Sequence, residues 1–163
     1  MRRKEGGVSA LAPGDAAPGF VLPDDAGGLA ALEDYRGSKL VLYFYPKDDT
    51  SGCTLEAQDF DRLAPDFAKA GARVLGVSAD GPASHAKFKG KHGLSLRLAS
   101  DEGKETLSAY GVWVEKNMYG RAYMGVERST FLIGADGRIA AIWRKVKTKG
   151  HAEAALAAAR DLP

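Results

Sequence analysis

The sequence contains a single cysteine, Cys53, and almost no excess of charge of either sign. One thiol cannot close an intramolecular disulfide, so the disulfide-stapled folds of small secreted proteins are excluded and a cytoplasmic location is expected. The 23 lysines and arginines nearly balance the 21 acidic residues, which leaves a formal net charge of +2. This balance gives no electrostatic reason to expect nucleic acid or a membrane surface as a partner.

Long apolar runs are also missing, and none approaches the length of a membrane span. The basic start at residues 1–5 is not followed by the apolar stretch of a secretory signal. The 163 residues, 45% of them hydrophobic, suffice for one buried core. We expect residues 1–12 to form a flexible N-terminal tail and residues 13–163 to form a single domain.

What is present is an alternation of strand-like and helix-like segments. The expected strands are 20–22, 29–32, 40–45, 74–78, 96–100, 130–133 and 139–142, and the expected helices are one that begins near 53 and others at 82–92, 104–110 and 150–162. Pro65 should segment the first helix. Glycine-containing turns should join the first two and the last two strands into hairpins, whereas residues 116–125 are expected to be irregular. This order predicts an α/β fold with a central mixed sheet flanked by helices and an N-terminal β-hairpin.

Cys53 follows the apolar strand 40–45 and a polar turn, where an amphipathic helix is expected to begin. Unpaired backbone N–H groups and the positive end of the helix dipole gather at such a position. Both favour the thiolate, which is the nucleophilic form of cysteine. A structural cysteine would more naturally lie inside an apolar run, so we interpret Cys53 as a reactive thiol.

Two further motifs accompany this thiol. Pro46, Thr50 and Cys53 form a Pro-x-x-x-Thr-x-x-Cys sequence, and Arg128 precedes the strand expected at 130–133. With these motifs the sequence closely resembles the peroxiredoxins, in particular the branch called PrxQ or bacterioferritin-comigratory proteins, over about residues 13–162. The matching segments are 43–48, 52–54, 119–121 and 127–133.

The resemblance implies a thioredoxin-like fold and a thiol-dependent peroxidase for hydrogen peroxide and organic hydroperoxides. It implies no metal, haem or flavin cofactor, and a monomer or weak dimer. By the same resemblance Cys53 is the peroxidatic cysteine, and Arg128 activates both its thiolate and the peroxide. Thr50 supplies a hydroxyl and Pro46 shields the thiolate.

Elementary chemistry supports these roles. A guanidinium beside the thiol stabilises the sulfur anion and the charge that spreads onto the peroxide oxygens. The Thr50 hydroxyl can accept the peroxide proton and donate toward sulfur, which holds the O–O axis in line for attack. Backbone N–H groups near Gly52 can hold the distal oxygen, because a glycine permits close approach.

The chain departs from many relatives at Gln58, where a resolving cysteine is frequent, and at Ser51, where a proline is frequent. With no second cysteine, the Cys53 sulfenic acid must be reduced by an external thiol such as glutathione, glutaredoxin or thioredoxin. The change at Ser51 should leave the chemistry intact and alter only the stiffness of the loop. The sequence leaves open the preferred peroxide, the physiological reductant and the oligomeric state.

Other interpretations remain. A thioredoxin-like redox sensor or a holdase could carry the same thiol without turning over peroxide. A cysteine hydrolase would need a histidine base, and no histidine is suitably placed in the sequence. Arg128 could serve only as a surface ion-pair partner, for example of Glu56, and Thr50 could be a helix cap.

Some residues carry no expected function. The histidines show no metal-ligand spacing and are expected to be solvated, as are the lysines and arginine of a basic run after the last strand; these residues are His85, His92, His151, Arg144, Lys145, Lys147 and Lys149. Trp113, Tyr119 and Tyr123 are expected to pack, with a rim around a peroxide pocket as the alternative.

Overall fold

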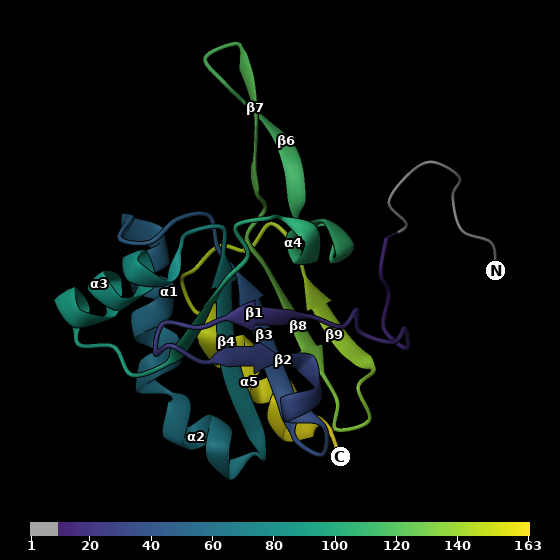
Figure 1. Ribbon diagram of the computed structural model, residues 1–163. Coiled ribbons are helices and arrows are strands. Elements are labelled where there is room, and N and C mark those ends of the chain that lie inside the picture. The colour runs from purple at the N-terminus through teal and green to yellow at the C-terminus, as the bar shows by residue number, and fades with distance from the viewer. Residues whose placement is uncertain (1–9) are drawn as a thin grey trace.

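The structure is a computed structural model that describes residues 10–163. Residues 1–9 of the expected tail lie outside the described residues. Its centre is a five-stranded mixed sheet with the strand order β5-β4-β3-β8-β9 (Figure 1). The strands of this sheet are β3 (Lys39–Phe44), β4 (Ala72–Ser78), β5 (Arg97–Ser100), β8 (Ser129–Ile133) and β9 (Ile139–Trp143). Strands β3, β4 and β5 are parallel, and β8 and β9 are antiparallel to their neighbours.

The central strand β3 is apolar without alternation because both of its faces are covered. Val41 and Tyr43 belong to one hydrophobic cluster, whereas Leu40, Leu42 and Phe44 belong to a cluster on the opposite face. The sequence pattern therefore predicted the central position of this strand correctly.

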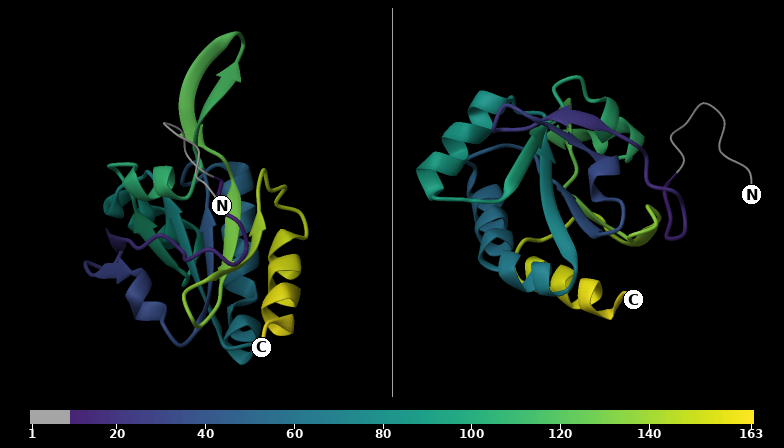
Figure 2. Two further views of the ribbon diagram at one scale, coloured as in Figure 1. Left: turned by 90° about the vertical axis from the view of Figure 1, so that its right-hand side faces the viewer. Right: turned by 60° about the horizontal axis from the view of Figure 1, so that its bottom comes forward.

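Helices cover one face of the sheet, and shorter elements cover the other (Figure 2). The helices are α1 (Ser51–Arg62), α2 (Ala64–Lys69), α3 (Pro82–His92), α4 (Glu105–Ala109) and α5 (His151–Asp161), with a 3-10 turn η1 (Leu32–Tyr35). Helices α1, α2 and α5 pack together on one face, while η1, α4 and the N-terminal hairpin lie on the other. Within residues 10–163 no helix has the length and apolar character needed to cross a bilayer.

The expected helices are present, and their observed ends differ from the expected ones by at most about two residues. Pro65 stands in the first turn of α2, where its missing N–H costs no helical bond, so the chain divides into α1 and α2 as predicted. Helix α3 ends at Gly93, which adopts the left-handed conformation typical of a helix terminus.

Both expected hairpins are present. Strands β1 (Val21–Pro23) and β2 (Leu29–Ala31) form the N-terminal hairpin, and β8 and β9 are joined through Gly137, which has a positive φ of 83°.

The segment expected to be irregular is instead a third hairpin, formed by β6 (Trp113–Met118) and β7 (Arg121–Val126). Tyr119 and Gly120 have φ values of 55° and 74°, as a tight two-residue hairpin turn requires. The hairpin projects from the body (Figure 1), so few of its side chains are buried and the sequence shows no period-2 hydrophobic pattern. Tyr119, which we expected to pack, is 99% exposed.

A glycine in β4 allows the sheet to support α1. A Cβ atom at Gly76 would lie 2.7 Å from Cζ of Tyr43, because the Tyr43 ring crosses directly over the glycine. The Tyr43 ring in turn stacks on Phe60 of α1, with 4.6 Å between ring centroids. Gly76 thus sets how closely α1, which carries Cys53, approaches the sheet.

Candidate active site

Cys53 is the third residue of α1, at the carboxyl end of β3. As in every α-helix, the backbone N–H groups of its first turn have no helical partners. The cysteine is only 2% exposed, so it is more deeply buried than its polar neighbours in the sequence suggested.

Strand pairing brings Arg128 to this thiol. Because β8 runs antiparallel to β3 and Ser129 pairs with Phe44, Arg128 lies beside the loop that leaves β3. Its Nη2 donates a hydrogen bond to Cys53 Sγ at 3.3 Å. Gly52 makes the approach possible, since a Cβ atom at this position would lie 3.2 Å from the same nitrogen.

Arg128 also forms an ion pair with Glu56, one turn after Cys53 in α1. Nη1 donates to Glu56 Oε1 at 2.6 Å, and the carboxylate is 1% exposed. The expected pair therefore exists, but it is buried and does not replace the contact with sulfur. Burial raises the pKa of Glu56 to about 7 even though the charge of Arg128 opposes the shift.

Thr50 occupies the N-cap position of α1 without making a side-chain cap bond. Its hydroxyl donates to the carbonyl oxygen of Lys47 at 2.8 Å. In this geometry the Thr50 proton points to Lys47 and not to the sulfur, so the hydroxyl oxygen can still act as a hydrogen-bond acceptor. Pro46 is half-buried at the start of the same loop.

A buried polar cluster that we did not predict anchors this loop to α3. Asp48 accepts hydrogen bonds from Tyr45 Oη at 2.6 Å and Ser84 Oγ at 2.7 Å, and its Oδ2 lies 2.7 Å from His85 Nδ1. The other ring nitrogen of His85 lies 3.0 Å from the carbonyl oxygen of Ala99. Burial on its own would raise the pKa of Asp48. The hydrogen bonds outweigh this effect and keep the pKa of Asp48 below its usual range. Asp48 and His85 are 37 positions apart in the sequence, so no local signal predicts this contact.

The expectation of solvated histidines is wrong for His85 and His151. Both are buried, His85 against Asp48 and His151 with its Nε2 2.7 Å from Thr130 Oγ1. Burial, and next the charge of Arg128, lower the pKa of His151 to about 4. Polar partners on other elements make this burial possible, and a single sequence cannot show them.

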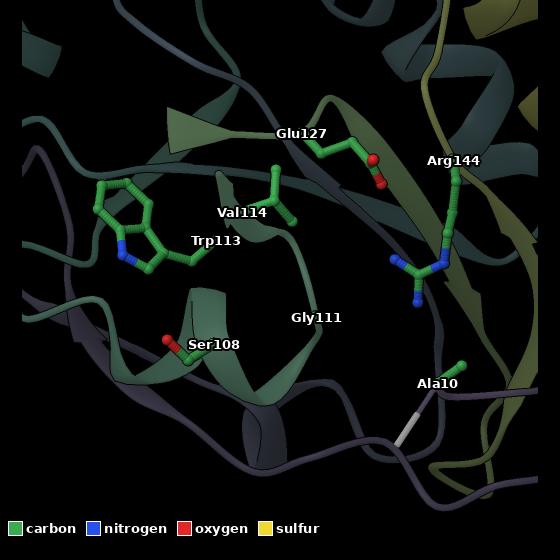
Figure 3. A pocket seen from close by; sticks show the side chains of 7 residues that line it. All are labelled: Ala10, Ser108, Gly111, Trp113, Val114, Glu127 and Arg144. Atoms are coloured by element: carbon green, nitrogen blue, oxygen red, sulfur yellow. The ribbon is translucent and has the colours of Figure 1, made fainter. Parts of the chain in front are cut away.

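Two hollows flank the base of the β6–β7 hairpin. One, of ≈ 550 Å³, opens beside the site; it is lined by Pro46, Val114, Glu115, Lys116, Glu127, Arg128, Lys145, Val146 and Lys147. The other, of ≈ 380 Å³, is shown in Figure 3; it is lined by Ala10, Ser108, Gly111, Trp113, Val114, Glu127 and Arg144. Only the first includes Arg128, so it is the hollow adjacent to the thiol. Within residues 10–163 no group of three or more histidine, cysteine or acidic residues is arranged to hold a metal ion.

Comparison with known proteins agrees with this geometry. The family model described as AhpC/TSA family matches residues 13–142. A putative peroxiredoxin Bcp of Coxiella burnetii is 49% identical over 85% of this chain and 91% of the relative. Peroxiredoxin Bcp of Bacillus subtilis is 46% identical over 91% of this chain and 95% of the relative.

Solved structures show the same fold. The bacterioferritin comigratory protein of Xanthomonas campestris superposes with a TM-score of 0.83 at 47% identity, over 86% of this chain and 90% of that chain. A cysteine-to-serine variant of PrxQ from Xylella fastidiosa superposes with a TM-score of 0.87 at 42% identity, over 92% of this chain and 96% of that chain. The thioredoxin-like fold is thereby confirmed.

The Xanthomonas protein has also been solved with serine in place of cysteine at each of two positions, so it has at least two cysteines where this chain has one. Matches of this identity and coverage establish that the chain belongs to the AhpC/TSA family and, within it, to the Bcp/PrxQ peroxiredoxins.

Proposed function

We propose that this thiol-dependent peroxidase reduces hydrogen peroxide and organic hydroperoxides through Cys53, with Arg128, Thr50, Gly52 and Pro46 completing the site. The observation that carries the proposal is the 3.3 Å contact between Arg128 Nη2 and Cys53 Sγ. A fixed guanidinium at this distance attracts the negative charge that moves from the sulfur to the peroxide oxygens during the reaction. The Xanthomonas relative is known for alkyl peroxide reduction, which supports the organic peroxides as substrates.

In the first half-reaction the Cys53 thiolate attacks one peroxide oxygen and the O–O bond breaks. The new S–O bond leaves the sulfur as sulfenic acid, Cys53–S–OH. The other oxygen departs with the electron pair of the broken bond and takes up a proton, as water or an alcohol. Arg128 stabilises the negative charge while it moves from sulfur to the departing oxygen.

The other residues position the peroxide. Thr50 accepts a hydrogen bond from the peroxide O–H, since its own proton is engaged by Lys47. Gly52 leaves room for Arg128 and exposes backbone N–H groups in the first helical turn. Pro46 lines the mouth of the site and has no N–H that would attract water.

In the second half-reaction an external thiol returns Cys53 to its reduced form. Because Cys53 is the only cysteine, no second thiol in the chain can do this. We place the protein in the cytoplasm, where reduced thiols are maintained.

The experiment that tests the proposal is intact-mass analysis after one equivalent of peroxide, followed by turnover assays with several thiol donors. We expect one added oxygen on the wild-type protein, none on Cys53→Ser, and restoration of the unmodified mass by a thiol. Oxidation of Cys53 that no thiol reverses would instead favour the redox-sensor alternative. Absence of the added oxygen would refute the peroxidase mechanism.

A further inference from the structure

The hollow beside Arg128 is lined by more basic than acidic side chains. Three lysines, Lys116, Lys145 and Lys147, join Arg128 around its ≈ 550 Å³, against two acidic residues, Glu115 and Glu127. Hydrogen peroxide fills only a small fraction of this volume. The hollow therefore has room for a larger molecule, and its excess of basic side chains favours an anionic one.

Two local features direct the lysines toward the hollow. A Cβ atom at Gly125 would lie 3.2 Å from Cδ of Lys116, so the glycine lets the lysine stem lie across β7 at the base of the hairpin. Val146 N–H donates to the carbonyl oxygen of Arg128 at 2.9 Å, which ties the loop bearing Lys145 and Lys147 to the site. Lys145 has a φ of 50°, a conformation that is unfavourable for a lysine and that tertiary contacts have to maintain.

These lysines are available to a ligand. Among the ion pairs within residues 10–163, none involves Lys116, Lys145 or Lys147. Burial lowers the pKa of Lys116, and the positive charge of Arg128 lowers it further. Lys116 is therefore close enough to Arg128 for the two cations to repel each other. An incoming anion would relieve the repulsion between these cations.

The position of the hollow indicates which part of a ligand it holds. Arg128 and Pro46 line it, but Cys53 does not, so the reacting atom of a ligand lies outside the hollow and a more distant group lies within it. The reaction also requires an external thiol, because the chain has one cysteine. A small thiol with carboxylates several bonds from its sulfur matches both requirements.

We infer that the hollow formed by Lys116, Lys145, Lys147 and Arg128 binds the carboxylates of an acidic low-molecular-weight thiol, of which glutathione is the type, and directs its sulfur to oxidised Cys53. This inference rests on the proposed function. The thiolate attacks Cys53 sulfur and the S–O bond breaks; the oxygen leaves as water after taking up a proton. The product is a mixed disulfide. A second thiol attacks the ligand sulfur of that disulfide, which yields free Cys53 and the disulfide of the two small thiols.

The test measures the reductive half-reaction separately. Cys53 is first oxidised with one equivalent of hydrogen peroxide, which is uncharged and does not need the hollow. Reduction is then followed in parallel with glutathione and with its diethyl ester, in which both carboxylates are masked. The readout is the ratio of the two rate constants in wild type, in Lys145→Gln/Lys147→Gln, and in the control Lys149→Gln. Lys149 is exposed on the same loop but does not line the hollow.

We expect the ratio to fall roughly five-fold in the double variant, to stay unchanged in the control, and to fall in wild type when salt is added. Comparing ratios between variants removes the intrinsic difference in reactivity between the two thiols. An unchanged ratio in the double variant overturns the inference, as does an equal fall in the control. If hydrogen peroxide adds no oxygen to Cys53, the proposed function fails as well, so the two failures are distinguishable.

A second arm identifies the source of the carboxylate. A fatty-acid hydroperoxide and its methyl ester are compared as oxidants of the same variants. The double variant could lose the preference for the free-acid peroxide while its ratio of rate constants for glutathione and the diethyl ester stays as in wild type. The hollow would then bind the carboxylate of a peroxide substrate, and the inference would be wrong. An equal reduction rate with both thiols, together with rapid reduction by thioredoxin, would also overturn it in favour of a protein reductant.

Discussion

Glu56 Oε1 accepts a 2.6 Å hydrogen bond from Arg128 Nη1 and so anchors one terminal nitrogen of the guanidinium. The other terminal nitrogen, Nη2, is thereby held 3.3 Å from Cys53. A charge that is already positioned when the peroxide arrives needs no rearrangement in the transition state, which is the condition for effective electrostatic catalysis.

Removing the guanidinium should slow the first oxidation sharply. For Arg128→Ala we expect the rate constant of Cys53 with hydrogen peroxide to fall by roughly 10²- to 10³-fold, the range for loss of one preorganised donor. Stopped-flow fluorescence measures this rate, and urea unfolding shows whether the variant remains folded. A folded Arg128→Ala with the wild-type rate constant would contradict our account of thiolate activation. Arg128→Lys keeps the charge but not the two-nitrogen geometry, so an intermediate rate is expected.

Adding one methyl group at Gly52 should separate activity from stability. The new Cβ would lie 3.2 Å from Arg128 Nη2, so close that the guanidinium has to shift from its position beside Cys53 by a few tenths of an ångström. We expect Gly52→Ala to slow oxidation by roughly 3- to 10-fold. Thermal stability should stay unchanged or rise, since alanine is the better helix former. A variant as active as wild type would show that Gly52 does not control the position of Arg128.

The role of Thr50 can be tested with a matched pair of variants. Thr50→Val removes the hydroxyl at nearly constant shape and should slow oxidation by roughly 10- to 100-fold, equivalent to one catalytic hydrogen bond. Thr50→Ser keeps the hydroxyl and should retain most of the activity. Equal rates in the two variants would assign Thr50 a structural role only.

Glu56 should make folding stability fall as pH rises. Its ordinary pKa of 4.5 is raised to about 7 in the folded protein, so between these values the folded state holds a proton that the unfolded state has lost. The resulting loss of stability is complete above pH 7 and amounts to roughly 3 kcal/mol. Glu56→Gln removes the effect, so its stability relative to wild type should increase from pH 4.5 to 7. Urea unfolding across that range measures the difference, with Glu115→Gln, a substitution of an exposed glutamate, as the control.

His151 should have the opposite effect. Its pKa falls from 6.5 to about 4, so on acidification the unfolded state binds a proton before the folded state does. The stability that neutral His151 contributes is present above pH 6.5 and is lost as pH falls toward 4. Between pH 4.5 and 6.5 the effects of Glu56 and His151 on the free energy of unfolding of the wild type should therefore partly cancel. His151→Asn removes the His151 contribution, so the stability of this variant should fall more steeply with rising pH than that of the wild type. The same pH dependence in the variant and the wild type would exclude the effect.

The sequence predicted the strands, helices and main candidate residues of this site because their signals are local. Thr50 and Cys53 lie where a short loop after an apolar strand leads into a helix, and Arg128 directly precedes the buried strand β8. The resemblance to peroxiredoxins added the expectation that these places meet. The antiparallel pairing of β3 and β8 is the physical reason that they do.

The remainder depends on contacts between distant segments. Asp48 and His85 have ordinary surface-type sequence contexts, and only the packing of α3 against the loop after β3 buries them together. The β6–β7 hairpin escaped recognition for a different reason. Its strands are largely exposed, so hydrogen bonding between backbones determines them more than any hydrophobic pattern.

Because the Tyr43 ring lies directly over Gly76, a substitution at this glycine can be harmful although the residue is remote from the reactive sulfur. An alanine in β4 would press on an aromatic ring that α1 rests against, and the displacement would reach the nucleophile through two rings. Engineering for robustness should therefore treat this interior glycine as part of the working enzyme. Solvent-exposed positions on the projecting hairpin tip, such as Tyr119, offer much safer places for change.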